Sequence, residues 1–463
     1  MTLHDKLDNF ASFERLTEEI TSFSSPGIRP GLRRVSRLLH LLGSPERRMR
    51  TIHVLGTNGK GSTAATIEAI LIAGGLKTAL YTSPHLISLQ ERLRVNGRLV
   101  ALDDWKNSWE RVVRAVDGDE ELSSDRPSFF ENFTAVCVLM MAEAEIDTAV
   151  IEAGMGGRYD ATSVCNPIAT LINPIGMDHT QYLGPTLADI ASEKFAAVKS
   201  GVDAFYSGDD VSLKPVFLEM CAAAGAIPRI LDEMALPYNI ECTTDGTSFS
   251  YETMKADARN MSSPLNIGRL VTPLLGTHQA YNAARVVTLL LSLRDKFSDF
   301  AFIGPEVIKL GLSRVNWPCR MELARVSRSG RIVILDGAHN DHAMRALVAS
   351  LDSMTNGGDK IKIGAVVFAV MGDKDISPIL ETMRPLDAPM YCTELPMERS
   401  EKSRDLAKLA QMSDIRVAGV FPAPADALRE ALSSTDPTEF VLCCGSLFLA
   451  GYIRKLLKYD GIL

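Results

Sequence analysis

The chain has 463 residues, of which 46% are hydrophobic and 23% charged, and its formal net charge is −8. Because a single core stops growing at roughly 250–300 residues, two domains are expected. The acidic balance argues against a nucleic-acid-binding or membrane-surface protein, since such proteins present a basic face.

The N-terminal residues carry acids and no apolar core, unlike a secretory signal. The longest apolar runs, such as "VVTLLLSL", are too short to span a bilayer. The eight cysteines form neither a Cys-x-x-Cys pair nor a Cys/His cluster typical of zinc sites. We therefore expect a cytoplasmic protein with reduced thiols.

Two amphipathic helices are predicted at the start of the chain. Apolar residues recur at helical spacing from Leu7 to Leu16 and again over residues 31–42. A short buried strand is predicted over residues 50–56, "RTIHVLG", followed by a helix over residues 62–74. The junction of a strand with a helix is the place where a phosphate-binding loop occurs.

The glycine-rich segment at this junction departs from the usual phosphate-loop pattern, which would place a glycine where Val54 stands. The context nevertheless favours phosphate binding, because backbone N–H groups and the helix dipole converge there. Glycines let the backbone approach oxygen atoms closely, and Lys60 adds a full charge. The predicted loop consists of Gly56, Thr57, Asn58, Gly59, Lys60, Gly61 and Ser62.

Polar residues follow three further predicted strands of this first domain. They are Ser83 in "YTSPHL", Glu152 before "GMGGR", and His179 in "GMDH". The Glu152 carboxylate resembles the acid that holds Mg²⁺ in phosphate-loop enzymes, and Ser83 offers a hydroxyl to a hard cation. Taken singly, Glu152 could equally be a solvated acid and Ser83 part of a common Ser-Pro turn, and a lone histidine such as His179 is more often structural than a metal ligand. Lys194 lies in a helix that Thr186 is predicted to cap.

The second half of the chain is predicted to contain a hairpin around Asp245-Gly246, a helix over residues 276–293, and a second α/β unit from about Pro305. Asp336 and His339 follow a strand at its carboxyl end, where open α/β sheets bind ligands. Arg320 could meet a phosphate with its two-pronged guanidinium.

The predicted fold class is α/β. Residues 1–300 form a phosphate-loop ATPase domain with a mostly parallel sheet, and residues 301–463 form a smaller Rossmann-like C-terminal domain. The boundary is expected within residues 296–306.

The ordered motifs together resemble the folylpolyglutamate synthase and dihydrofolate synthase family of the Mur ligase superfamily. The resemblance runs from about residue 28 to the end of the chain. The motifs that carry it are "HVLGTNGKGS", "YTSPHL", "ERLRVNG", "IEAGMGGRYDAT", "IGMDH", "SEK", "THQAYNAA", "WPCRME", "DGAHN", "DKD" and "GSLFLAG".

This resemblance implies an ATP-dependent acid–amino-acid ligase that joins L-glutamate to a pteroate or folate carboxylate through an acyl phosphate. It implies that Gly56 to Ser62 bind the ATP phosphates, and that Ser83 and Glu152 hold one Mg²⁺ while His179 holds a second. Lys194 matches a carbamylated lysine, so that Lys60, His179 and Lys194 are the expected catalytic residues. The remaining expected contacts are Asn282, Arg320, Asp336 and His339 with the nucleotide, and Ser128, Phe129, Phe130 and Glu131 with the pterin acid.

Three positions depart from the family pattern. Cys319 stands where glycine is usual, "EKFAAVK" replaces "EKAGI", and Arg34 stands where an acid is frequent. Two alternative functions are a peptidoglycan Mur ligase and a nucleotide-binding regulator without catalysis. Only 55 residues precede Gly56, which leaves little room for the nucleotide-sugar domain of peptidoglycan ligases. We expect a monomer that binds no nucleic acid and no membrane. The motifs leave open whether dihydropteroate, tetrahydrofolate polyglutamates or both are used.

Overall fold

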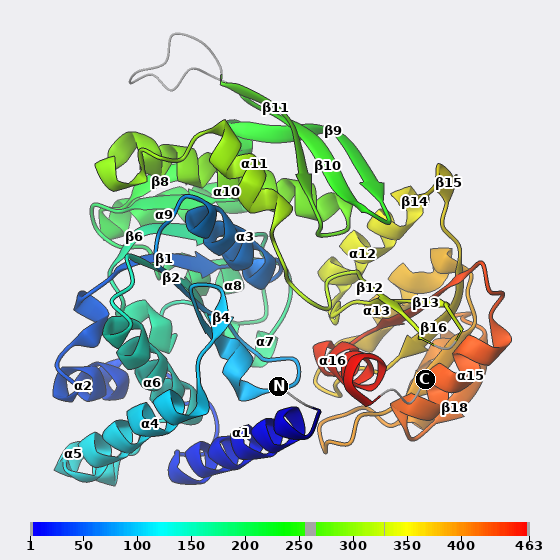
Figure 1. Cartoon of the computed structure of the whole chain (residues 1–463), viewed down its shortest axis with the longest axis horizontal. Coiled ribbons are helices and arrows are strands. Elements are labelled where there is room, and N and C mark those ends of the chain that lie inside the picture. Colours follow the sequence, from blue (N-terminus) through cyan, green and yellow to red (C-terminus); the bar gives the residue numbers. More distant parts are fainter. Residues whose placement is uncertain (1–2, 255–264, 328, 461–463) are drawn as a thin grey trace. The chain divides into compact units, whose positions relative to one another are not determined.

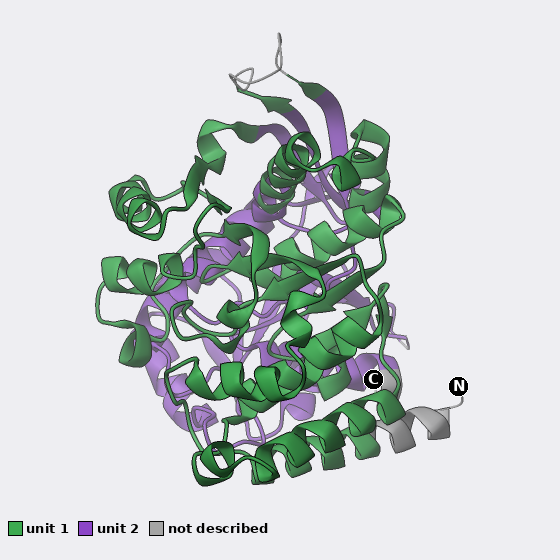
Figure 2. Cartoon of the chain, turned by 90° about the vertical axis from the view of Figure 1, so that its left-hand side faces the viewer, with its two compact units in different colours: residues 1–236, 252–266, 282–312 green, residues 237–251, 267–281, 313–463 purple. Residues whose placement is uncertain are grey.

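The computed structural model describes residues 3–254, 265–327 and 329–460, and its elements are labelled in Figure 1. The chain divides into two compact units that interleave in sequence (Figure 2). Unit 1 comprises residues 1–236, 252–266 and 282–312, and unit 2 comprises residues 237–251, 267–281 and 313–463. The α/β class is confirmed, whereas the division at residue 300 stays a prediction.

Unit 1 contains an eight-stranded sheet with the order β4-β3-β2-β5-β1-β6-β7-β8. Neighbouring strands from β2 to β8 in this order are parallel, and β3 and β4 continue the sheet in antiparallel pairing. The strands are β1 (Arg50–Leu55), β2 (Thr78–Tyr81), β3 (Leu93–Val95), β4 (Arg98–Leu99), β5 (Thr148–Glu152), β6 (Pro167–Ile172), β7 (Asp203–Tyr206) and β8 (Ile227–Ile230). The mostly parallel sheet predicted for this region is therefore present.

The central strands of this sheet are almost continuously buried, as expected for a parallel sheet that helices cover on both faces. The helix α3 (Lys60–Ala73) packs on β1, β2 and β5. One core joins Ala79, Tyr81, Ala149 and Ile151 of the sheet to four helices, which are α1 (Leu3–Phe23), α2 (Arg33–Leu41), α4 (Leu102–Asp117) and α6 (Phe129–Glu143). A second core packs α8 (Leu187–Phe195) and α9 (Lys214–Ala224) near β6 and β7. The two helices predicted at the start of the chain are α1 and α2.

Unit 2 contains a six-stranded sheet with the order β12-β13-β19-β16-β17-β18, parallel except for β12. Its strands are β12 (Glu322–Arg325), β13 (Ile332–Leu335), β16 (Ile363–Phe368), β17 (Met390–Thr393), β18 (Val417–Phe421) and β19 (Phe440–Cys444). The accompanying helices are α12 (Asp341–Ser353), α13 (Ile376–Met383), α14 (Ser403–Met412), α15 (Pro424–Ser434) and α16 (Leu447–Lys455). A second α/β unit with a mainly parallel sheet was predicted here and is confirmed.

A third sheet has the order β11-β10-β9-β14-β15. The strands β9 (Ala235–Thr243) and β10 (Gly246–Thr253) form the hairpin that Asp245-Gly246 predicts. The other strands are β11 (Asn266–Thr272), β14 (Thr355–Asn356) and β15 (Asp359–Lys360). The remaining helices are α5 (Glu120–Ser124), α7 (Thr180–Leu183), α10 (Thr277–Lys296) and α11 (Pro305–Ser313). Within the described parts of the chain, no helix is long and apolar enough to cross a membrane.

Candidate active site

The segment predicted to be the phosphate loop connects β1 to the first turn of α3, which is the strand-to-helix position expected for it. Gly56 has a φ of 132° and Gly59 a φ of 81°, and both values lie in the region that favours glycine. A side chain on Gly56 would bring its Cβ within 2.7 Å of the Asn173 Cβ, so only glycine fits at that position. The loop leads directly into the N-terminus of α3, and the N–H groups at a helix N-terminus favour an anion.

Two lysine ammonium groups meet at one carbonyl of this loop. Lys60 Nζ donates to the carbonyl oxygens of Gly56 and Thr57, each at 3.1 Å, and Lys194 Nζ donates to the Gly56 oxygen at 3.0 Å. Burial, reinforced by the charge of Lys60, lowers the pKa of the Lys194 amine to about 7. In a substantial fraction of the molecules the Lys194 amine is therefore neutral at physiological pH, and a neutral amine is nucleophilic.

The Lys194 side chain reaches this place because α8 is firmly anchored. Thr186 caps the helix by accepting a hydrogen bond from the Asp189 N–H at 3.2 Å, as the sequence predicts. At the other end, the "GMGGR" loop packs directly on the helix, so that a Cβ on Gly157 would lie 2.7 Å from the Lys194 carbonyl oxygen. The Arg158 N–H also donates to the Glu193 carbonyl oxygen at 2.9 Å.

Ser83 follows β2 and Glu152 is the last residue of β5. These two strands are adjacent and parallel, so both residues lie at the carboxyl-terminal edge of the sheet. The Glu152 carboxylate is buried and accepts a hydrogen bond from the Ser83 N–H at 3.2 Å. A carboxylate beside a serine hydroxyl is a suitable partial ligand set for Mg²⁺, which keeps several waters and binds substrate phosphates. The described residues contain no group of three or more His, Cys, Asp or Glu side chains that could hold a metal ion by itself.

His179 lies at the N-cap of the short helix α7, in the loop that follows β6. Its φ of 52° is uncommon for a residue with a side chain, and such conformations gather at functional sites. The neighbouring Asp178 accepts a hydrogen bond from the His179 N–H at 2.9 Å and is close enough to Lys194 to favour that lysine's charged form.

Asn282 of α10 is brought to the phosphate loop, although it is distant in sequence. Its Oδ1 would lie 3.2 Å from a Cβ on Gly59. The side chain therefore lies directly against the loop predicted to bind the nucleotide.

The other three predicted nucleotide residues form a cluster within unit 2. The two carboxylate oxygens of Asp336 accept hydrogen bonds from the Met321 N–H at 2.8 Å and the Ala338 N–H at 2.7 Å. Burial raises the pKa of the Asp336 carboxyl, and the nearby Arg320 guanidinium opposes this shift. A Cβ on Gly337 would lie 2.3 Å from Arg320 Nη1, and His339 Nδ1 is 2.8 Å from the Gly337 oxygen.

Comparison with known proteins identifies the family of this chain. Residues 319–447 match the Mur ligase, glutamate ligase domain. The chain is 30% identical over 433 residues to the dihydrofolate synthase/folylpolyglutamate synthase of Bacillus subtilis, covering 93% of this chain and 96% of that protein. The chain belongs to the dihydrofolate synthase/folylpolyglutamate synthase family. It is therefore an ATP-dependent acid–amino-acid ligase.

Solved structures of the family have the same fold. The folylpolyglutamate synthase of Mycobacterium tuberculosis, complexed with ADP and AMPPCP, matches with a TM-score of 0.83 and 28% identity over 97% of this chain and 99% of that one. E. coli FolC in complex with DHPP and ADP matches with a TM-score of 0.80 and 26% identity, covering 97% of this chain and 98% of that one. The family resemblance inferred from the motifs is confirmed.

The four residues predicted to contact the pterin acid lie at the start of α6 in this synthase. Ser128 and Glu131 form a capping box, in which Glu131 accepts hydrogen bonds from the Ser128 N–H and hydroxyl at 2.8 Å each. Phe130 packs its ring against Gly154, two residues after Glu152, where a Cβ would lie 2.5 Å from the Phe130 Cζ. Phe130 is thus placed beside the glycine turn, while Ser128 and Glu131 make structural contacts.

Two departures from the family pattern have a structural explanation. Arg34 is buried and its Nε donates to both oxygens of Glu131 at 3.2 Å, so the basic residue is compensated by an acid on α6. Cys319 has a φ of 57°, a left-handed conformation in which glycine carries no steric penalty. This conformation explains why glycine is usual there, and the cysteine side chain is fully buried in this synthase.

A pair that the sequence did not single out lies next to the predicted metal residues. Arg92 Nε donates to His85 Nδ1 at 3.0 Å, and the Arg92 guanidinium lies 5.2 Å from the centre of the Phe133 ring. Burial and the Arg92 charge lower the pKa of His85 to about 3, so this imidazole stays neutral. Both residues belong to quoted motifs, "YTSPHL" and "ERLRVNG", but their contact depends on the fold.

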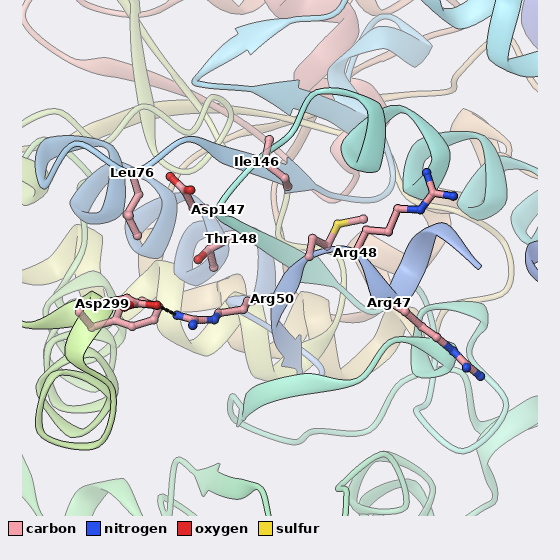
Figure 3. Close-up of a pocket in the computed structure, with 10 residues that line it drawn as sticks. Arg47, Arg48, Arg50, Leu76, Ile146, Asp147, Thr148 and Asp299 are labelled. Atoms are coloured by element: carbon pink, nitrogen blue, oxygen red, sulfur yellow. Dashed lines mark ion pairs between the residues drawn. The ribbon is translucent and has the colours of Figure 1, made fainter. Parts of the chain in front are cut away.

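A cavity of about 460 Å³ lies at the opposite, amino-terminal edge of the unit 1 sheet (Figure 3). Its charged lining groups already have partners within the protein. Arg50 forms an ion pair with Asp299, and Asp147 accepts a hydrogen bond from the Lys77 N–H at 2.8 Å. Figure 3 shows Arg47 and Arg48 pointing away from the Arg50–Asp299 pair. None of the predicted site residues lines this cavity.

Proposed function

We propose that this enzyme ligates L-glutamate to the carboxylate of a pteroate or folate through an acyl phosphate, and that the sites inferred from the sequence perform this reaction. The observation that carries the proposal is the convergence of Lys60, Lys194 and Asn282 on one phosphate loop beside Ser83 and Glu152. The Bacillus subtilis relative is named a dihydrofolate synthase/folylpolyglutamate synthase, and the solved E. coli relative is in complex with DHPP and ADP.

The chemistry needs no protein nucleophile. The substrate carboxylate attacks the terminal phosphorus of ATP, and ADP leaves. The glutamate amino nitrogen then attacks the acyl carbon, forming the amide bond and releasing inorganic phosphate and a proton. What the protein must supply is positioning of the reactants and compensation of charge on the transferred phosphoryl group.

Lys60 is the residue proposed to compensate that charge. Among the residues that the structure describes, its ammonium donates to the carbonyl oxygens of Gly56 and Thr57. A nucleotide phosphate is a stronger acceptor because it carries a formal negative charge. The proposed exchange of acceptors requires only rotation of the flexible side chain.

Ser83 and Glu152 are proposed to hold one Mg²⁺, and His179 a second. The donor set of the first site fits, because a buried carboxylate and a hydroxyl suit a hard cation. Bound there, the cations would neutralise charge on the phosphates and orient them. The role of Glu152 in this proposal is to supply a formal negative charge at the carboxyl end of β5.

Lys194 is proposed to be carbamylated, as the family resemblance implies. Its pKa of about 7 leaves enough neutral amine to react. The amine nitrogen forms a bond to the carbon of CO₂, and one proton passes to solvent. The product is an anion with two oxygens, which removes the repulsion between Lys194 and Lys60 and suits a hard cation or its bound water.

Arg320, Asp336 and His339 are proposed to contact the nucleotide together with Asn282. Replacing Arg320 with alanine should raise KM for ATP by roughly tenfold or more, since hydrogen bonds between charged groups are the strong ones. Asp336→Ala should also weaken ATP use, because two backbone N–H groups lose their acceptor. Steady-state kinetics against ATP measure both effects. Exposed Arg404→Ala and Asp359→Ala are the matched controls, and normal ATP kinetics in both site variants would remove these residues from the nucleotide site.

A substrate panel tests the proposed function. The enzyme is incubated with ATP, Mg²⁺ and L-glutamate, together with dihydropteroate, a tetrahydrofolate or a tetrahydrofolate polyglutamate, and the product masses are read directly. We expect the mass of one glutamyl residue to be added to at least one acceptor. A protein that consumes ATP without forming any glutamylated product would contradict the proposal. The same panel decides between dihydrofolate synthase activity, folylpolyglutamate synthase activity and both.

A further inference from the structure

The loop that follows β6 forms a backing for the phosphate loop. The Asn173 N–H donates to the Leu55 carbonyl oxygen at 2.9 Å, and the Thr57 N–H donates to the Pro174 oxygen at 2.9 Å. The Thr57 hydroxyl donates to the Gly176 oxygen and accepts from the Gly176 N–H, each at 3.0 Å. Residues 173–176 thus form several hydrogen bonds with the end of β1 and the start of the phosphate loop.

The Asn173 side chain contacts both ends of the phosphate loop. At the start of the loop it lies against Gly56, where an added Cβ would be 2.7 Å from the Asn173 Cβ. At the end of the loop, Asn173 Nδ2 donates to the Thr63 hydroxyl at 2.9 Å. Thr63 belongs to the first turn of α3, three residues after Lys60. Asn173 is therefore a bridge across the loop that carries Lys60.

Packing alone does not account for an amide at this place. Asn173 and Thr63 are both fully buried, and Asn173 Oδ1 has no hydrogen-bond partner among the described residues. A buried polar group without a partner costs free energy, which an apolar side chain of similar shape would avoid. The feature that distinguishes asparagine from such a side chain is its directional bond to Thr63.

We propose that Asn173 is a positioning residue for ATP, which holds the phosphate loop in its nucleotide-binding shape through its hydrogen bond to Thr63. Neither side chain is exposed, so both act through the loop backbone and Lys60. The inference rests on the assignment of Gly56 to Ser62 as the ATP phosphate site. It predicts that loss of this hydrogen bond weakens nucleotide binding and leaves the affinities for glutamate and folate unchanged.

The test is a double-mutant cycle with Thr63→Val, Asn173→Ala and the combined variant. Isothermal titration calorimetry with ADP alone measures nucleotide binding, and steady-state kinetics give KM for ATP, glutamate and folate. Each single variant should raise the ADP Kd about three- to tenfold, which is the usual net effect of one hydrogen bond. The double variant should be little worse than either single variant, because the two groups form one bond. KM for glutamate and folate should stay unchanged.

Two further variants keep the test decisive. Thr63→Ser retains the hydroxyl and should bind ADP like the wild type. This variant tests the hydrogen bond even if Asn173→Ala does not fold. Thr170→Val on β6 is the matched control, since the Thr170 hydroxyl is also buried but has no partner among the described residues. Unchanged ADP affinity in Thr63→Val, additive effects in the double variant, or equal changes in all three KM values would overturn the proposal. ADP binding needs no ligation, so this outcome is separate from a failure of the proposed function.

Discussion

Lys60→Ala should lower turnover by roughly 10²–10³, equivalent to about 2.7–4 kcal/mol of transition-state stabilisation. The reason is that Lys60 is the cation at the N-terminus of α3, and its present partners are loop carbonyl oxygens rather than core groups. Turnover is measured as glutamate-dependent phosphate release at saturating ATP, so that a change in nucleotide affinity does not contribute. Circular dichroism should show an unchanged fold, because the side chain is only half-buried.

The matched control is Lys106→Ala, which removes an exposed lysine from α4 and should keep wild-type turnover. Lys60→Met keeps most of the side-chain volume without the charge and should behave like Lys60→Ala. Wild-type turnover in Lys60→Ala, to within a few-fold, would remove Lys60 from the transition state. A loss in Lys60→Ala that Lys60→Met does not share would point to side-chain volume instead of charge.

Lys194→Ala should be nearly inactive, and short carboxylates such as acetate or formate should restore part of its turnover. The restored activity is expected because these anions can supply the two oxygens that the proposed carbamate would provide. The wild-type enzyme should lose activity when bicarbonate and CO₂ are removed and regain it when they return. Measuring turnover of the alanine variant against carboxylate concentration tests the first expectation directly.

The pKa of Lys194 predicts the direction of the pH dependence. This pKa is lowered to about 7, so the amine is protonated and unreactive toward CO₂ as the pH falls below that value. Reactivation of CO₂-depleted enzyme should therefore be faster at pH 8 than at pH 6 when the concentration of dissolved CO₂ is held equal at the two pH values. Lys194→Arg keeps a charge but cannot be carbamylated under these conditions, and it should be as inactive as Lys194→Ala. Full activity in either variant would exclude a catalytic carbamate.

The position and backbone shape of the proposed phosphate loop were predictable because they depend on local sequence. Gly56 and Gly59 need conformations that only glycine adopts freely, and Lys60 and the helix follow without interruption. The strand-end positions of Ser83 and Glu152 were predictable for a related reason. Parallel strands direct their carboxyl ends to one edge, so these residues had to lie near the loop.

Other features depended on pairings between distant segments. Arg34 meets Glu131 across 97 residues, and Asn173 meets Thr63 across 110 residues. No periodicity or spacing connects such positions, because helix and strand patterns report only which face a residue occupies. The interleaving of the two units is a further example, since residues 237–251 and 267–281 group with a unit formed mainly from residue 313 onward.

The most direct test of the central claim uses a folate or pteroate acceptor labelled with oxygen-18 in the reacting carboxyl group. When an acyl phosphate forms and glutamate attacks it, one carboxyl oxygen leaves with the phosphate. Mass spectrometry of the inorganic phosphate should therefore detect one labelled oxygen for each amide bond formed. Phosphate without the label, released together with a glutamylated product, would contradict ligation through an acyl phosphate.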